Sequence, residues 1–268
     1  MKGTHLDALV GAALQQLAVR ATMTPLPEII ARARDAGPVR PFAQALKGAA
    51  ARGSALIAEV KRKSPSKGDL NPDLHPATLA AAYERGGAAC LSVLTDGVHF
   101  GGSLVDLVAA RAATAIPVLR KDFIVTPYQL HEARVHGADA VLLIAAALEP
   151  KRLRDLRELA RELSLTVLIE VHDDSEVESA RAAEPELLGI NARSLKTLVV
   201  DSGTFARVAP LCAGPWTLVA ESGVRTPDDV RGFALNGAQA FLVGEALSTA
   251  TDPESATRTL VNALTKGA

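Results

Sequence analysis

The chain has 268 residues, 48% hydrophobic and 22% charged, so it can bury a sizeable core as two small domains or as one α/β barrel. Its 29 basic and 30 acidic residues nearly cancel, which excludes a global electrostatic attraction to nucleic acid or to an anionic membrane. No apolar run reaches the ~20 residues that span a bilayer, and no signal-peptide pattern opens the chain. We therefore expect a cytoplasmic protein that binds neither nucleic acid nor membrane.

The first fifty residues do not share the pattern of the rest of the chain. Residues 6–19 are apolar enough to form a packed helix, and residues 41–49 are a second candidate. The residues that break the chain between them are Pro25, Pro27, Gly37, Pro38 and Pro41. We expect an N-terminal helical extension over residues 1–50, which either covers the bottom of the following domain or reaches over its top.

Beyond residue 50, short apolar runs alternate with helical segments. The runs are nearly continuous in Val, Leu, Ile and Ala, which is typical of parallel strands covered on both faces. Eight strands are expected, over residues 55–60, 89–94, 116–120, 139–145, 165–171, 187–191, 217–221 and 239–243. The clearest helices between them cover 127–137, 149–164 and 226–237, the last with Thr226 as its N-cap.

Eight strand–loop–helix units in about 210 residues match a (β/α)8 barrel, which leaves no sheet edge exposed. An open doubly wound sheet would use the same alternation, but no GxGxxG motif follows the first strand to support dinucleotide binding. We predict the α/β fold class, with a single TIM barrel over residues 51–268 as the catalytic domain.

Five of the predicted strands end in polar residues that a buried strand does not tolerate. These residues are Glu59 and Lys61, Lys121, Glu170, Asn191, and Glu221 with Ser222. A buried charge must pair or bind something charged, and barrel active sites lie at the carboxyl ends of the strands. One shared site is therefore expected, and lysines beside carboxylates in a partly dry pocket suit acid–base chemistry. Each residue taken alone could instead form a structural ion pair.

Small residues follow the last two predicted strands. Ser222 and Gly223 follow the seventh strand and Gly244 follows the eighth, the two loops whose backbone N–H groups often bind phosphate in barrels. Either glycine alone could simply form a tight turn. The loop after the first strand adds four cations, Lys61, Arg62, Lys63 and Lys67, which would suit an anionic substrate.

Seven segments, taken together and in order, resemble the indole-3-glycerol phosphate synthase family. They are IAEVKRKSPSKG (57–68), LSVLTDGVHFGGSL (91–104), PVLRKDFIVTPYQLHEARVHGADAVLLI (117–144), LIEVH (168–172), LGINAR (188–193), AESGV (220–224) and LVGEAL (242–247). The resemblance implies conversion of 1-(2-carboxyphenylamino)-1-deoxyribulose 5-phosphate into indole-3-glycerol phosphate, carbon dioxide and water in tryptophan biosynthesis. It implies no metal and no organic cofactor.

The same resemblance implies roles for the polar residues. Lys121 would be the general acid that protonates the ketone as the aromatic carbon attacks it. Lys61 would hold the substrate carboxylate and assist the dehydration. Glu170 would be the general base, and the residues that orient and support this group would be Glu59, Glu221 and Asn191.

Substrate-binding roles are implied for a second set of residues, namely Ser64, Phe100, Arg193, Ser222, Gly223 and Gly244. Phe100 would pack against the anthranilate ring. Arg193 would contact the substrate carboxylate or brace Glu170. The segment 6–19 has only Asp7 as a charge, unlike the first helix usual in the family, so its role in gating the site is open.

Two other functions stay open from the sequence. Another phosphate-sugar barrel, of the phosphoribosyl isomerase type, would use a Cys/Asp or Asp/Asp pair at the strand ends. A non-catalytic phosphate-binding barrel would need only the Gly223 and Gly244 cradle, without paired acid and base groups. We expect a monomer or weak homodimer, no metal site among the six histidines, and Cys90 and Cys212 as reduced, partly buried thiols.

Overall fold

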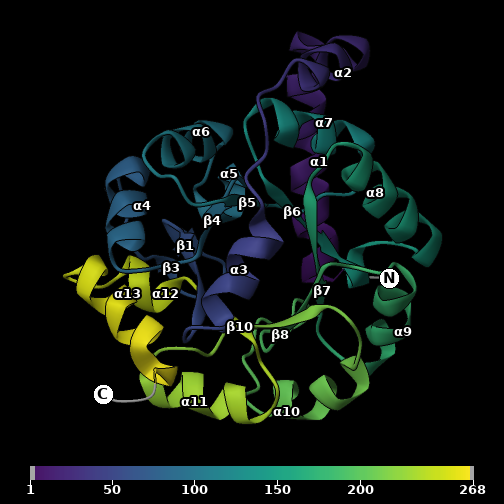
Figure 1. Cartoon of the computed structure of the whole chain (residues 1–268). Helices are drawn as coiled ribbons and strands as arrows, with labels where there is room; N and C mark the ends of the chain where they lie inside the picture. The colour runs from purple at the N-terminus through teal and green to yellow at the C-terminus, as the bar shows by residue number, and fades with distance from the viewer. Residues whose placement is uncertain (1–3, 266–268) are drawn as a thin grey trace.

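The computed structural model describes residues 4–265, which build a closed barrel of eight parallel strands inside a ring of helices (Figure 1). The barrel strands are β1 (Ala55–Val60), β4 (Cys90–Leu94), β5 (Val118–Lys121), β6 (Ala140–Ile144), β7 (Thr166–Val171), β8 (Leu187–Asn191), β9 (Thr217–Glu221) and β10 (Ala240–Val243). They pair in this order, and β10 closes the ring against β1. The predicted TIM barrel is confirmed, with strand ends displaced by one or two residues at most.

A helix follows each barrel strand and covers its outer face. These helices are α4 (Pro76–Arg85), α6 (Leu104–Ala112), α7 (Pro127–Val135), α8 (Pro150–Glu162), α9 (Val177–Ala182), α10 (Thr204–Val208), α11 (Pro227–Leu235) and α13 (Pro253–Val261). Thr126 and Thr226 close capping boxes at the starts of α7 and α11, so two of the orphan N–H groups of each helix find partners. Proline in the first turn of both helices costs no hydrogen bond.

Shorter elements lie in the loops. They are the hairpin β2 (Lys63–Ser64) with β3 (Gly68–Asp69), the helices α5 (Gly97–Phe100) and α12 (Glu245–Ser248), and the 3-10 turns Ala145–Ala147, Asp174–Glu176, Ala209–Cys212 and Asn262–Leu264. The hairpin, α5 and α12 all follow the carboxyl ends of barrel strands. They therefore stand around the mouth of the barrel, where a site of this fold is built.

Strand β1 illustrates how the core orients the site. Leu56 and Ala58 pack outward in the cluster shared with the surrounding helices, whereas Ala55 and Ile57 pack inside the barrel. Side chains alternate along a strand, so the residue after Ala58, Glu59, also points inward. The apolar interior thus delivers a carboxylate to the barrel axis at the carboxyl end of β1.

Three helices precede the barrel, although the sequence predicts only two. They are α1 (His5–Met23), α2 (Leu26–Arg34) and α3 (Phe42–Ala50). The prediction missed α2 because it treated Pro25 and Pro27 as interruptions. Pro25 is the N-cap residue and Pro27 lies in the first turn, where a missing N–H group costs nothing.

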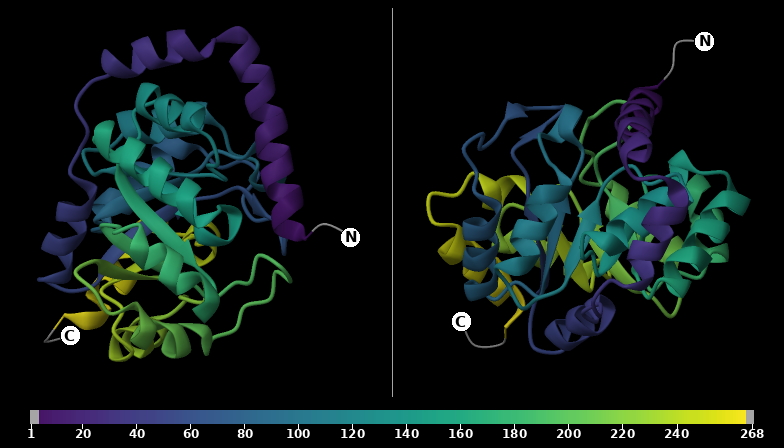
Figure 2. Two further views of the ribbon diagram at one scale, coloured as in Figure 1. Left: turned by 90° about the vertical axis from the view of Figure 1, so that its right-hand side faces the viewer. Right: turned by 90° about the horizontal axis from the view of Figure 1, so that it is seen from above.

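The sequence leaves open whether the N-terminal helices cover the bottom of the barrel or reach over its top. In the structure they reach both ends. Phe42 and Leu46 of α3 are fully buried in the cluster that fills the barrel interior, and the Cys90 thiol donates to the Phe42 carbonyl at 3.7 Å. Leu9 of α1 lines the cavity at the mouth. Figure 2 shows α1 and α3 at opposite ends of the barrel, joined by α2 along its side.

The two cysteines are free thiols, as predicted, but both are fully buried rather than partly buried. Among the described residues, no helix combines the length and apolarity needed to cross a membrane.

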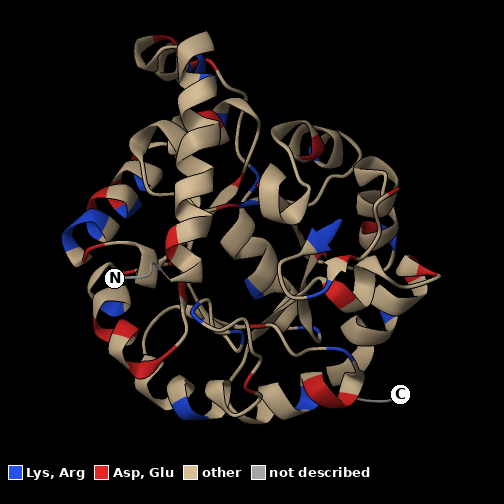
Figure 3. Cartoon of the chain, turned by 180° about the vertical axis from the view of Figure 1, so that it is seen from behind, with Lys and Arg blue, Asp and Glu red and all other residues tan. Residues whose placement is uncertain are grey.

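Helix α1 is fastened to the strand that carries Lys121. The Arg20 guanidinium donates to both oxygens of Glu132 on α7, at 2.6 and 3.0 Å. Glu132 also pairs with Arg120, a fully buried residue of β5 that neighbours Lys121, at 3.0 Å. The charged residues of α1 lie only near its two ends, and the rest of its surface is uncharged (Figure 3).

This fastening predicts an effect on stability. Replacing Arg20 by alanine leaves the buried Glu132 with Arg120 as its remaining cation, so we expect the free energy of unfolding to fall by roughly 1–2 kcal/mol. Arg32→Ala is the matched control, because its pair with Glu28 on α2 is solvent-exposed and should contribute less than about 0.5 kcal/mol. Denaturant unfolding of both variants measures the difference in the free energy of unfolding. Equal denaturation midpoints for the two variants would contradict a stabilising role for the Arg20–Glu132 pair.

Candidate active site

The mouth of the barrel holds a cavity whose wall contains every residue that the sequence proposed for the site. Those residues are Glu59, Lys61, Ser64, Phe100, Lys121, Glu170, Asn191, Arg193, Glu221, Ser222, Gly223 and Gly244. They come from the carboxyl ends of β1, β5, β7, β8, β9 and β10 and from the loops that follow these strands; Phe100 comes from α5 in the loop after β4. The geometry brings these residues together; their individual roles stay predictions.

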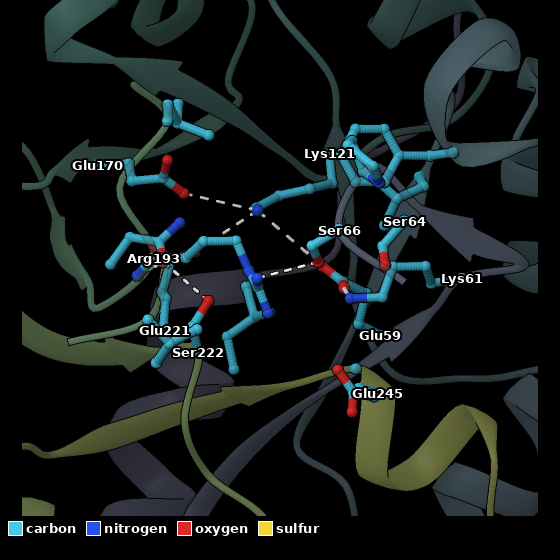
Figure 4. Close-up of a pocket in the computed structure, with 18 of the residues that line it drawn as sticks. Glu59, Lys61, Ser64, Ser66, Lys121, Glu170, Arg193, Glu221, Ser222 and Glu245 are labelled. Atoms are coloured by element: carbon cyan, nitrogen blue, oxygen red, sulfur yellow. Dashed lines mark hydrogen bonds and ion pairs between the residues drawn. The ribbon is translucent and has the colours of Figure 1, made fainter. Parts of the chain in front are cut away.

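Lys121 occupies the centre of this group (Figure 4). Its Nζ atom lies 3.5 Å from Glu170 Oε2, 3.5 Å from Glu221 Oε2 and 4.0 Å from Glu59 Oε2. Burial opposes the charged amine, but the three carboxylates outweigh burial and raise the pKa of Lys121 above its usual value. Lys121 is therefore an ammonium group at neutral pH, able to donate a proton.

A second lysine shares one of these carboxylates. Lys61 Nζ donates to Glu59 Oε1 at 2.7 Å, and the Ser92 hydroxyl of β4 donates to Glu59 Oε2 at 3.3 Å. Burial alone would raise the pKa of Glu59, but Lys61 and Lys121 together lower it. Glu59 is thus an ionised bridge that holds both lysines at one side of the cavity.

The other two carboxylates differ in charge. Burial would raise the pKa of Glu170, but the Lys121 ammonium and then His172 hold it well below the usual range. Burial and the negative charge of Glu170 raise the pKa of Glu221 well above the usual range. Two carboxyl groups at one site with separated pKa values can take different roles, Glu170 as the ionised base and Glu221 as the group that holds a proton more readily.

The loop after β9 turns sharply under the cavity. Ser222 and Gly223 both have positive φ values, 63° and 85°. The Ser222 hydroxyl donates to Asn191 Oδ1 at 2.8 Å, and the Arg193 backbone N–H donates to the same oxygen at 2.9 Å. Asn191 thereby ties the β8 and β9 loops together, which gives it a supporting position.

Gly244 after β10 has no room for a side chain. A Cβ atom there would lie 2.3 Å from Glu59 Oε1 and 2.8 Å from Lys61 Nζ. Glycine is needed at this position because the backbone passes close to the Glu59–Lys61 pair. The sequence indicates only that Gly244 could belong to a phosphate-binding turn and does not reveal this contact.

Three of the four cations in the loop after β1 bind protein groups: two of these partners lie outside the cavity wall, and the third, Glu245, belongs to it. Arg62 pairs with Asp106 on α6, Lys63 donates to the Val98 carbonyl, and Lys67 pairs with Glu245. The expectation of a fourfold cationic mouth is therefore wrong, because only Lys61 of this set lines the cavity. The ion pairs instead hold the hairpin against the loops after β4 and β10.

Arg193 reaches across the mouth to this hairpin. Its Nη1 atom donates to the Ser66 hydroxyl and to the Leu198 carbonyl, both at 2.9 Å. Of the two roles left open for Arg193, bracing Glu170 has no contact to support it, because His172 occupies that position. Arg193 remains a candidate for contact with an anionic ligand.

One wall of the cavity is apolar. Phe100 of α5 lies beside Phe123 with ring centroids 6.2 Å apart, and Leu142 and Ile144 of β6 continue this surface, while Leu242 of β10 lines the cavity from the opposite side of the barrel. Transfer of an aromatic ring from water to this apolar surface is favourable, because it buries apolar area. The sequence indicated Phe100 but not the other four, whose side chains cannot be told from ordinary core residues by pattern alone.

Two further residues that shape the site went unrecognised or undervalued. His172 lies with Nε2 3.1 Å from Glu170 Oε1, where the sequence suggested only that a contact was conceivable. Gly189 in the middle of β8 leaves the space that Glu221 fills, since a Cβ atom there would lie 2.0 Å from Glu221 Oε1. A glycine inside a strand is itself a signal for such a close approach.

Comparisons with known proteins agree on one family. The family model described as indole-3-glycerol phosphate synthase matches residues 6–260. The curated indole-3-glycerol phosphate synthase 1 of Streptomyces coelicolor is 53% identical over 96% of this chain and 95% of its own length. The indole-3-glycerol phosphate synthases of Nocardioides sp. and Mycolicibacterium gilvum are 53% and 50% identical over 94% and 97% of this chain, and 96% and 94% of their own lengths.

A solved structure shares the fold alone. The thiamine phosphate pyrophosphorylase of Pyrococcus furiosus superposes with a TM-score of 0.59, covering 78% of this chain and 94% of its own, at 16% sequence identity. At that identity the likeness extends to the barrel and not to the chemistry.

Proposed function

The chain belongs to the indole-3-glycerol phosphate synthase family, and we propose that the charged group at the mouth of its barrel performs the family's reaction. The chain is a carboxy-lyase of L-tryptophan biosynthesis that acts on a phosphorylated small molecule. It converts 1-(2-carboxyphenylamino)-1-deoxyribulose 5-phosphate by ring closure, decarboxylation and dehydration. The observation that carries the proposed mechanism is the Lys121 ammonium group within 4.0 Å of three carboxyl groups.

Ring closure is assigned to Lys121. Attack of the aromatic carbon on the ketone develops negative charge on the carbonyl oxygen, which a positioned ammonium group neutralises by donating a proton. Loss of carbon dioxide then returns electrons to the ring. The position of Lys121 supports this assignment, because its Nζ atom projects into the cavity among three carboxyl groups that keep the amine protonated at neutral pH.

Dehydration is assigned to Lys61 and Glu170. Lys61 would hold the substrate carboxylate during the first step and protonate the departing hydroxyl in the second. Glu170 would remove the proton whose loss makes the new ring aromatic. The position of Glu170 across the cavity from the Glu59–Lys61 pair supports this division, since acid and base must act on different sides of the substrate (Figure 4).

Substrate binding is assigned to the rim. The small residues Ser222, Gly223 and Gly244 would cradle the phosphate, with Ser64 beside them, and Arg193 would contact the substrate carboxylate. Phe100 would pack against the anthranilate ring, supported by the apolar wall around it. The isomerase alternative lacks its Cys/Asp or Asp/Asp pair, because among the described residues that line the cavity there is no cysteine and one aspartate, Asp122.

The organisation of the molecule is part of the same proposal. We assign residues 1–50 to a helical extension and residues 51–268 to the catalytic barrel. We further propose a cytoplasmic enzyme that works as a monomer or weak homodimer, binds no nucleic acid or membrane, and needs no cofactor.

The division between the two steps predicts an unusual outcome for Glu170→Gln. Lys121 keeps Glu59 and Glu221 as neighbours in this variant, so ring closure and decarboxylation should continue, whereas dehydration loses its base. A single turnover should release carbon dioxide while indole fluorescence develops at least about 100-fold more slowly. Glu158→Gln on the exposed face of α8 is the matched control. Equal rates for carbon dioxide and indole in Glu170→Gln would refute the assignment.

A further inference from the structure

His172 lies at the carboxyl end of β7 with a carboxylate on each side of its ring. Nε2 lies 3.1 Å from Glu170 Oε1, and Nδ1 lies 3.2 Å from Glu176 Oε2. The His172 backbone N–H donates to the same Glu176 oxygen at 2.9 Å. The His172 side chain is only 7% exposed. The three side chains form a carboxylate–imidazole–carboxylate row that begins inside the active site and ends outside it.

This row determines the charge of the ring. Nδ1 forms a hydrogen bond with Glu176, and Nε2 lies at ion-pair distance from Glu170 without a well-aligned hydrogen bond. A neutral imidazole has one N–H group, whereas the charged ring carries one on the side of each carboxylate. Burial opposes the charged ring, but Glu170 and Glu176 outweigh it and raise the pKa of His172 to about 10. The ring is therefore an imidazolium at neutral pH.

The row also determines the orientation of Glu170. His172 approaches Oε1 and Lys121 approaches Oε2, so the two carboxylate oxygens have different cationic neighbours. Rotation of the carboxylate would lose both contacts. The oxygen beside Lys121 therefore faces the catalytic ammonium group, and the other oxygen faces the His172 ring.

His172 does not itself reach the substrate cavity. It lines a second cavity of about 210 Å³ on the other side of Asn191, together with Glu176. Any effect of His172 on the reaction must therefore pass through Glu170.

The other charged groups around the ring come in compensating pairs. Asp173 and Lys196 lie 3.5 Å apart, and Asp201 and Arg207 lie 3.3 Å apart, on the wall of the second cavity. On the substrate side, Lys121 and Glu221 face Glu170 rather than the ring. Glu170 and Glu176 are thus the groups that set the protonation of His172.

We propose that His172, held by Glu176, is a positioning residue that fixes the Glu170 carboxylate and keeps it ionised until it accepts the proton in dehydration. The proposal rests on the role of Glu170 proposed above. In a catalytic triad, an anionic carboxylate orients a histidine that acts as the base. Here the parts are exchanged, because a cationic histidine ring orients a carboxylate that acts as the base.

Single-turnover kinetics of His172→Gln tests the proposal. Removing the cation and its contact should slow indole formation by about 10- to 100-fold while KM changes by less than about threefold. Carbon dioxide release should keep the wild-type rate, because Lys121 is untouched. The acidic limb of the pH profile for indole formation should move to higher pH, because Glu170 loses a cation that lowers its pKa. His75→Gln, at an exposed position, is the matched control.

Glu176→Gln supplies a second test that keeps the ring in place. Loss of the Glu176 charge should lower the pKa of His172 toward its ordinary value of about 6.5. Indole formation should then fall as the pH rises through that value, because the ring loses its charge above it. The wild-type enzyme should show no such fall near neutral pH, since the His172 pKa is about 10.

The outcomes separate the two proposals. Unchanged indole rates and pH profiles in both variants would overturn the role of His172, and so would equal slowing of carbon dioxide and indole. If His172→Gln does not fold, the pH profile of Glu176→Gln decides alone. If Glu170→Gln forms indole at the wild-type rate, the assignment of Glu170 as the base is wrong. If Glu170→Gln is slow but His172→Gln behaves as wild type, Glu170 remains the base and only the positioning role of His172 is wrong.

Discussion

Lys121→Ala is expected to lower kcat by roughly 10³- to 10⁴-fold while the substrate still binds. The variant loses the only ammonium group that lies within 4.0 Å of Glu59, Glu170 and Glu221 at once among residues 4–265. Without it, the proposed proton donor to the ketone oxygen is missing, so ring closure slows before decarboxylation. Both carbon dioxide and indole should therefore disappear in a single turnover, unlike the pattern expected for Glu170→Gln.

Lys151→Ala on α8 is the matched control for this experiment, since its side chain is 82% exposed and pairs only with Asp155. Equilibrium titration with substrate should give a dissociation constant within about tenfold of wild type, because the phosphate cradle and the apolar wall remain. Unchanged turnover in Lys121→Ala would show that another group protonates the ketone.

Gly189→Ala is expected to damage catalysis without removing any functional group. The added methyl group would lie 2.0 Å from Glu221 Oε1 and 3.2 Å from Leu168 Cδ1, inside the closed barrel. The Glu221 carboxyl group must then shift, which disturbs its 3.5 Å contact with Lys121. Misplacement of about 1 Å in an active site can cost about 100-fold, so we expect a fall in kcat of that order. Overpacking should also lower the free energy of unfolding by about 1–3 kcal/mol.

The control for Gly189→Ala is Gly232→Ala in α11, where no atom lies within 4 Å of the added methyl group. There the change should leave kcat unaltered and raise the free energy of unfolding by about 0.5–1 kcal/mol. Steady-state kinetics and denaturant unfolding of both variants provide the comparison. Wild-type kcat in a folded Gly189→Ala enzyme would show that the position of Glu221 does not matter.

The barrel could be predicted from sequence because its signal is local and repeated. Each strand is a short run of Val, Leu, Ile and Ala, and each ends at a turn, so the strand ends were located to within two residues. The site followed from the same signal: Glu59, Lys121 and Glu170 interrupt apolar runs at the end where a barrel builds its site. The structure brings these side chains to one cavity, as the barrel fold leads us to expect.

The remaining features depend on contacts between distant segments, which no local pattern reveals. Helix α2 was missed because a proline in a first turn and a proline in a loop look alike in sequence. The loop cations Arg62 and Lys67 seemed free for a substrate because their partners lie on α6 and after β10. The charge of His172 likewise depends on carboxylates that folding brings to both ring nitrogens.

The most direct test of the account follows the two products of one reaction. The purified chain is incubated with 1-(2-carboxyphenylamino)-1-deoxyribulose 5-phosphate while carbon dioxide release and indole fluorescence are recorded together, with no metal or cofactor added. We predict that indole-3-glycerol phosphate and carbon dioxide form in equal amounts until the substrate is consumed. Absence of both products from a well-folded protein would contradict the assignment of this barrel mouth to ring closure.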